Sequence, residues 1–309
     1  MTTPRITPAS WAILLTLGLV WGSTFLIVEI ALRGVPPGWV SAARVAFAAA
    51  LMLVVWGAKG FRLFEGPVGP RTWALLVFVC MLSATFPFLL LPWGQQYVTS
   101  AFAGITMASM IFIVLPMAHF MVPGERMQLR STIGFLIGFA GVVILIGGES
   151  LTNRGDTMAL WGGLAVFGTA ACYGVGSIYM RRLPPCDPLG LSAMVMIIGA
   201  IATVPAAFAL DGPPPMPDRE TFIALAVLGL IPTAGANFLR TVLIRSAGPT
   251  FLSLVNYIVP VISVALGAAV LSEALPPTML IALVAILGGM AISQWESLVR
   301  VAGRLRARA

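Results

Sequence analysis

The fold is decided by TSAFAGITMASMIFIVLPMAHFMVPGER, residues 99–126, because AGPTFLSLVNYIVPVISVALGAAVLSEA, residues 247–274, repeats its plan. The two stretches align without gaps at an offset of 148 residues, which places Glu125 on Glu273. Each consists of an apolar run followed by an acidic turn. Weak internal symmetry of this kind predicts a chain built from two related halves.

The alignment extends outward from these stretches, and small loop gaps account for the change of offset from 148 to 152. Further matched pairs are Gly141 with Gly289, Trp21-Gly22 with Tyr173-Gly174, and Ser41-Ala42 with Ser192-Ala193. Their common order divides the chain into a first five-helix repeat (1–150), a second (151–300) and a basic cytoplasmic tail (301–309).

The composition is that of a membrane protein. Of 309 residues, 59% are hydrophobic and 9% are charged, and the mean hydropathy is +0.99. A soluble fold of this length needs more polar residues to cover its surface. Low charge argues against disorder, and three cysteines argue against a secreted disulfide scaffold. The net charge of +7 reflects membrane topology, so no nucleic-acid partner is expected.

Ten apolar runs separated by short polar breaks predict an all-α membrane protein with ten transmembrane helices. Each run is close to the ~20 residues that a helix needs to cross ~30 Å of hydrocarbon. The first run is too long for a signal peptide and leads directly into further spans. The predicted spans are 9–31, 39–58, 72–95, 99–121, 129–148, 158–180, 187–210, 220–245, 249–272 and 277–296.

Basic residues fall mainly on one side of these spans, which predicts cytoplasmic N and C termini and a multi-pass protein of the inner (plasma) membrane. Because each half has an odd number of spans, the second repeat is expected to be inverted relative to the first. The cytoplasmic set is Arg5, Lys59, Arg62, Arg71, Arg126, Arg130, Arg181, Arg182, Arg245, Arg300, Arg304, Arg306 and Arg308; the opposite set is Arg33, Arg154 and Arg219.

Several motifs, in this order, resemble the EamA family of the drug/metabolite transporter superfamily. They are Trp21-Gly-Ser-Thr-Phe, Arg44 after Pro36-Pro37, Gly-Glu-Arg at 124–126, Tyr179-Met-Arg-Arg and Leu271-Ser-Glu. The chain looks most similar to bacterial YddG-type exporters of aromatic amino acids. It departs from the family pattern at Tyr173, where Trp is frequent, and at Pro123, before Glu125. The resemblance implies a ten-helix exporter of small metabolites.

Polar and aromatic side chains near mid-span are the candidates for a substrate cavity. Asn and Tyr are costly to place in lipid, and aromatic and thioether side chains suit planar apolar substrates. Ordinary packing is the alternative for each of them. The candidates are Trp21, Ser83, Phe86, Met107, Met110, Tyr173, Asn237, Asn256 and Tyr257.

Prolines inside the spans are candidate hinges for alternating access. Each removes one backbone hydrogen bond and can kink its helix, and the freed carbonyl must face protein or water. Static kinks are the alternative interpretation. The candidates are Pro87 and Pro92 in the third span, Pro116 in the fourth, Pro232 in the eighth and Pro260 in the ninth.

Charged residues bear most directly on mechanism. No Asp or Glu is expected at mid-depth, which predicts transport without a dedicated carboxylate proton switch. Arg44 and Arg240 are each about 7–8 Å inside a span, where they could snorkel to head groups or draw a substrate carboxylate. His119 is expected to be a packing histidine rather than a proton carrier.

The remaining features suggest no cofactor. The cysteines lack metal-ligand spacing, and no phosphate-binding motif or room for an ATPase module is evident. The expected partners are a small-molecule substrate and the bilayer, with no ATPase subunit. Gly134, Gly138 and Gly141, with Gly288-Gly289, suggest tight packing within a monomer or a weak homodimer. The rival functions are a broad drug or quaternary-amine exporter and, less in keeping with a single His, a lipid-modifying enzyme.

Overall fold

The computed structural model describes residues 6–122, 124–152 and 157–306. Pro123, Arg5, Arg154 and Arg308, which entered the sequence interpretation, lie outside these ranges. Helices in chain order are α1 (Pro8–Gly22), α2 (Thr24–Leu32), α3 (Pro37–Ala58), α4 (Pro70–Cys80), α5 (Phe86–Gln95), α6 (Ser100–Met107), α7 (Met110–Met121), α8 (Leu129–Thr152), α9 (Thr157–Met180), α10 (Pro188–Asp211), α11 (Arg219–Leu228), α12 (Ala236–Ala247), α13 (Pro249–Leu252), α14 (Val255–Leu271), α15 (Pro277–Ser293) and α16 (Trp295–Arg306). Two π-helical segments, η1 (Met81–Thr85) and η2 (Gly229–Gly235), lie between α4 and α5 and between α11 and α12.

The predicted all-α fold is confirmed for the described residues, where the only β-pairing is one isolated bridge between Phe64 and Cys186. Nine helical segments of this part of the chain are long and apolar enough to cross a membrane. A tenth is added if α15 and α16, which meet at a 70° bend, count as one broken span. The predicted tail is residues 301–309. Its described part, residues 301–306, belongs to α16.

Five spans are interrupted rather than continuous α-helices. The first breaks at Ser23, between α1 and α2, and the third and eighth contain η1 and η2. The fourth breaks between α6 and α7 and the ninth between α13 and α14. The two π-helical segments begin at Met81 and Gly229, which are separated by the repeat offset of 148 residues.

The chain forms two compact units, each drawn from both sequence halves. Unit 1 comprises Met1–Leu26, Thr99–Leu160 and Ala236–Ala309. Unit 2 comprises Ile27–Val98 and Trp161–Gly235. Helices of one half therefore pack on helices of the other inside each unit.

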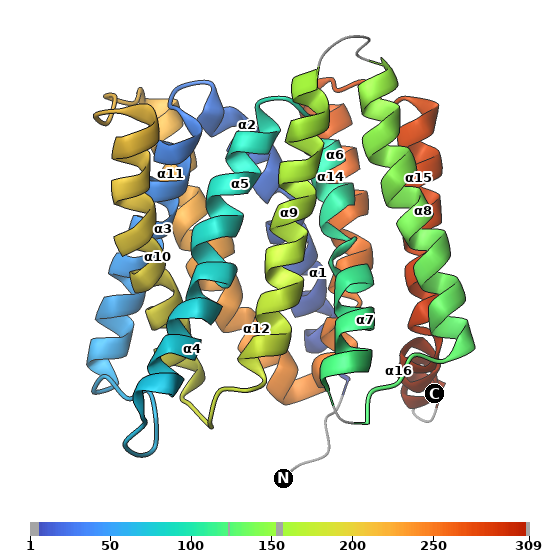
Figure 1. Cartoon of the computed structure of the whole chain (residues 1–309), viewed down its shortest axis with the longest axis horizontal. Helices are drawn as coiled ribbons and strands as arrows, with labels where there is room; N and C mark the ends of the chain where they lie inside the picture. Colours follow the sequence, from blue (N-terminus) through green and yellow to red (C-terminus); the bar gives the residue numbers. More distant parts are fainter. Residues whose placement is uncertain (1–5, 123, 153–156, 307–309) are drawn as a thin grey trace. The chain divides into compact units, whose positions relative to one another are not determined.

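In unit 1, α8 and α15 lie side by side and run antiparallel (Figure 1). Near the start of α8, Gly134 approaches Gly289 near the end of α15, where an added Cβ would lie 2.5 Å from the Gly134 carbonyl oxygen. Near the other end of α8, Gly148 approaches Thr278. Glycine permits this backbone contact because it has no Cβ. These glycines therefore pack within the chain.

Also in unit 1, Glu273 caps the first turn of α6, which packs on α14. Its carboxylate accepts hydrogen bonds from the backbone N–H groups of Ser100 (2.8 Å) and Ala101 (3.0 Å). The first N–H groups of a helix lack intrahelical acceptors, and a negative charge there also complements the helix dipole. The acidic turn that marks the second repeat thus has a structural role.

We expect Glu273→Ala to destabilise the protein by about 1–2 kcal/mol, because two N–H groups lose their acceptor. The measurement is the midpoint of thermal unfolding in detergent. Glu65→Ala is the matched control, since Glu65 is exposed in the loop between α3 and α4. Equal midpoints for the two variants would contradict a capping role for Glu273.

In unit 2, α3 and α10 form the corresponding antiparallel pair. At one end, Gly38 donates its N–H to the Asp211 carboxylate (2.7 Å), so the end of α10 meets the start of α3. At the other end, Asp187 donates its N–H to the Leu63 carbonyl oxygen (2.8 Å), so the start of α10 meets the segment after α3. η2 packs on α3, and η1 packs on α10.

Candidate functional site

Arg44 of α3 lies in the interior of unit 2 with a side chain that is 6% exposed. It is the only buried charged residue among those that the structure describes. Its neighbours come from three other elements, namely Phe88 on α5, Tyr173 on α9 and Thr233 on η2. The guanidinium is therefore enclosed by protein and does not snorkel to the membrane surface.

Thr233 connects Arg44 to the break in the eighth span. Pro232 has no N–H, so it cannot bond to the carbonyl of Leu228 four residues earlier. The Thr233 hydroxyl donates to that carbonyl oxygen instead, at 2.7 Å. The same hydroxyl oxygen accepts a hydrogen bond from Arg44 Nε at 2.9 Å. The freed carbonyl is thus satisfied by the residue that holds the arginine.

Pro92 has a parallel effect in the third span. It cannot donate to the carbonyl of Phe88, and the Ser41 hydroxyl of α3 hydrogen-bonds to that oxygen. The Phe88 ring in turn stacks on Arg44, whose guanidinium carbon lies 4.4 Å from the ring centroid. Cation–π contact stabilises a desolvated guanidinium. Two proline-freed carbonyls therefore help to fix the surroundings of one buried charge.

The terminal nitrogens of Arg44 have no hydrogen-bond partner among the described residues. A guanidinium has five N–H donors, and only Nε–H has a hydrogen-bond partner among the described residues. Within the same residues, no carboxylate pairs with this arginine. A buried charge without a partner is costly, whereas a planar carboxylate could take two parallel hydrogen bonds from it. The arrangement is suited to binding an anion.

The other unit 2 candidates lie on η1, α5 and α9. Ser83 is half-buried within η1, and Phe86 is 43% exposed at the start of α5. Tyr173 is half-buried and lies near Arg44. The structure therefore brings Arg44 and Tyr173 together.

Six cavity candidates belong to unit 1. Trp21, Met107, Met110, Asn237 and Tyr257 are half-buried, whereas Asn256 is exposed on α14. The Tyr257 hydroxyl is enclosed and has no hydrogen-bond partner among the described residues. A substrate role for these side chains remains a prediction.

The prolines do not all mark the breaks. Pro232 lies inside η2, and Pro87 is the second residue of α5, which follows η1. Pro92, Pro116 and Pro260 lie within α5, α7 and α14, and the interruptions of the fourth and ninth spans come one to two turns before their prolines. At the break in the fourth span, Ser109 N–H bonds to the Thr106 carbonyl, a tighter i→i−3 turn. Whether any of them moves remains a prediction.

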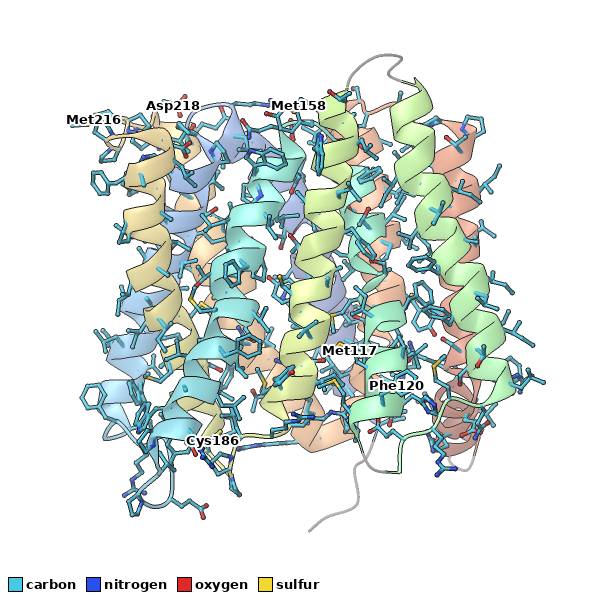
Figure 2. All side chains as sticks on the ribbon, in the orientation of Figure 1. Met117, Phe120, Met158, Cys186, Met216 and Asp218 are labelled. Carbon is cyan, nitrogen blue, oxygen red and sulfur yellow. The ribbon has the colours of Figure 1, made fainter. Side chains whose placement is uncertain are left out.

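The two other charged candidates lie in unit 1. Arg240 is exposed on α12, which fits a snorkelling arginine. The Nδ1 atom of His119 accepts a hydrogen bond from the Met127 N–H at 3.2 Å. The His119 ring also contacts Phe120 edge-on at 4.8 Å, and Figure 2 shows Phe120 at the end of unit 1 opposite Met158. His119 thus braces the segment between α7 and α8.

The roles of Thr233, Phe88 and Ser41 around Arg44 were not predicted from the sequence. Proline offered a signal, because each freed carbonyl requires a donor and each donor here contacts the arginine site. The sequence does not state which helices are neighbours, so the donors could not be assigned.

We expect Thr233→Val to weaken transport and Thr233→Ser to restore it, because only a hydroxyl can both bond to the Leu228 carbonyl and accept from Arg44. Loss of a hydrogen bond to a charged group costs about 1.5–3 kcal/mol. Flux in proteoliposomes, measured as KM and maximal rate, tests this positioning role. A Val variant with the KM of the parent for a carboxylate substrate would contradict it.

The sequence is similar to those of known membrane transporters. The model of the EamA-like transporter family matches residues 9–147 and again residues 160–294. Together the two matches cover most of the chain, and each lies within one of the predicted halves.

The chain is also similar to curated proteins. The matched region covers most of two of these relatives and about half of a third. "Uncharacterized inner membrane transporter YedA" of Escherichia coli is 24% identical over 263 residues, covering 85% of this chain and 83% of YedA. "Uncharacterized transporter YvbV" of Bacillus subtilis is 22% identical over 288 residues, covering 90% and 89%. "Protein PagO" of Salmonella typhimurium is 30% identical over 147 residues, covering 47% and 46%.

One solved crystal structure has a similar fold. It superposes with a TM-score of 0.65 at 21% identity, and the match covers 94% of this chain and 98% of that chain. This likeness concerns the fold alone.

Proposed function

Because this chain belongs to the EamA-like transporter family, we propose that it exports small metabolites that carry a carboxylate, with aromatic or neutral amino acids as the leading class. The solute would pass through a central cavity by alternating access, as in secondary transporters with paired repeats. The relative named an inner membrane transporter supports a location in the inner membrane.

The observation that carries this proposal is the buried Arg44, whose terminal nitrogens have no hydrogen-bond partner among the described residues. Its Nε–H is held by Thr233, and its face is stacked on Phe88. The site therefore offers a fixed, desolvated fork for a carboxylate beside aromatic surface. Tyr173 adds a further aromatic ring and hydroxyl on α9, consistent with a YddG-type substrate.

A lipophilic cation is the rival substrate within the same family. A quaternary amine would favour a carboxylate or an open aromatic face in the site. The buried charge in unit 2 is instead positive, and it opposes a cation. Exporting drugs or quaternary amines is therefore the second candidate.

An inverted-repeat architecture is part of the proposal and has three supports. One family model matches each half, and the π-helical segments recur at the repeat offset. Counterpart helices α3 and α10, and α8 and α15, are antiparallel neighbours, as inversion requires. The distribution of Lys and Arg supports cytoplasmic termini for both ends.

The proposed mechanism needs no dedicated proton carrier. Among the described residues, no Asp or Glu is buried, and such residues are the usual relays of proton-coupled transporters. The solute would then move down its own gradient or with weak coupling.

The test is a flux panel in proteoliposomes that contain the purified protein and have neither a pH gradient nor a membrane potential. We expect saturable uptake of aromatic or neutral amino acids, with empty liposomes as the control. A cationic dye and charged amino acids complete the panel. Uptake of the dye alone would favour the drug-exporter function, and accumulation that requires an imposed proton gradient would rule out the uncoupled mechanism.

A further inference from the structure

A groove in unit 2 has no role in the proposed transport site. It is a groove of about 400 Å³ between α3, α11 and the segment that joins α10 to α11. All of its lining residues are apolar, including Ala43, Ala46 and Ala50 of α3 and three prolines from residues 214–217. The volume is within the range of ligand-binding pockets, about 300–1,000 Å³.

The length of the groove along α3 is close to the thickness of one leaflet of a bilayer. Its lining on α3 runs from Trp39, two residues after the helix begins, to Ala50. Eleven residues of α-helix rise about 16 Å, roughly half of the ~30 Å hydrocarbon core. Ala46 and Ala50 are exposed, so the groove is open along this length.

The groove has fixed walls. Phe47 of α3 and Phe222 of α11 meet edge-to-face with centroids 5.9 Å apart. At the end of the span, the Trp39 indole donates to the Gly212 carbonyl oxygen at 3.1 Å. The alanines between these walls leave the space that larger side chains would fill.

Two arginines are close in sequence to residues that line the groove, Arg33 two residues before Val35 and Arg219 two residues after Pro217. Gly34 packs against Thr221 of α11, where an added Cβ would lie 2.0 Å from Thr221 Oγ1. This contact brings the turn containing Arg33 next to Arg219, the first residue of α11. Both arginines are exposed, and within the described residues no hydrogen bond or ion pair is made by either guanidinium group. They are two of the three basic residues that the topology assigns to this side.

Asp218, the residue before Arg219, is the N-cap of α11. Asp218 accepts a hydrogen bond from the Thr221 N–H at 2.8 Å, and its hydrogen bonds with Thr221 hold its pKa below the ordinary value. Figure 2 shows Asp218 and Met216 at the same end of unit 2, opposite Cys186. The Asp218 carboxylate is therefore held by the first turn of α11.

We propose that this groove holds one acyl chain of a bilayer phospholipid whose phosphate group is bound by Arg33 and Arg219. An apolar surface at this depth excludes water and is filled by hydrocarbon. Two unpartnered guanidinium groups at its open end supply charge-assisted hydrogen bonds to the phosphate. The length and apolar lining of the groove match an acyl chain, and the two arginines match a phosphate group. A phospholipid combines both parts in one molecule.

The proposal is tested by counting phospholipids retained on the detergent-purified full chain with native mass spectrometry. We expect Ala46→Phe to remove the retained lipid, because the ring fills the groove. Ala140→Phe, on an exposed position of α8, is the control and should keep it. We expect Arg33→Gln and Arg219→Gln to lower lipid affinity about tenfold each, whereas Lys59→Gln with Arg71→Gln, two exposed cations elsewhere in unit 2, should not.

Three outcomes would overturn the proposal. The first is equal lipid retention by Ala46→Phe and Ala140→Phe. The second is an unchanged affinity in the Arg33 and Arg219 double variant, which would leave the phosphate unassigned. The third is a dimer without lipid that dissociates on Ala46→Phe, which would identify a second copy of the chain as the occupant. None of these measurements depends on the transported substrate.

Discussion

Arg44→Gln is expected to abolish most transport of carboxylate substrates. Truncating one partner of a buried, hydrogen-bonded charge pair costs about 2–5 kcal/mol, which corresponds to a loss of at least about thirtyfold in affinity. Arg44→Lys keeps the charge but lacks the planar fork, so an intermediate loss is expected. The measurement is initial flux in proteoliposomes as a function of substrate concentration.

A matched pair of substrates separates a direct contact from a structural effect. The parent protein should prefer an aromatic amino acid to the amine that lacks its carboxylate, and Arg44→Gln should lose this preference. The variant should remain folded, because it removes a desolvated charge from unit 2, and its elution and thermal midpoint report on folding. An Arg44→Gln variant that is folded and still discriminates between the two substrates would remove Arg44 from the binding site.

The helical spans could be predicted from the sequence because bilayer thickness fixes their length. The predicted run 187–210 and the observed α10, Pro188–Asp211, differ by one residue at each end. Proline at the start and a polar cap at Asp187 define such boundaries locally. The length and the ends of a single helix can therefore be predicted from the sequence.

The Arg44 site could only be predicted in part, because its contacts join residues far apart in the chain. The Arg44–Thr233 bond spans 189 residues, and the depth of Arg44 along its helix allowed either snorkelling to head groups or contact with a substrate carboxylate. The direction in which a side chain points depends on which helices are neighbours. The two compact units, each mixing both halves, supply that information.

The second large effect is expected from Gly289→Ala, at the antiparallel contact of α8 and α15. The new Cβ would lie 2.5 Å from the Gly134 carbonyl oxygen and 2.5 Å from the Gly138 backbone nitrogen. Overpacking typically costs about 1–3 kcal/mol, and here the obstacle is backbone rather than a movable side-chain end. We expect the thermal midpoint in detergent to fall by several degrees.

Gly288→Ala is the matched control, because nothing lies within 4 Å of a Cβ added at that neighbouring position. Both substitutions introduce the same methyl group into the same helix and raise its intrinsic helix propensity equally. A difference between them therefore reports the α8–α15 contact alone. If Gly289→Ala instead left the midpoint unchanged and converted a dimer to a monomer, the glycines would serve association between chains rather than packing within one.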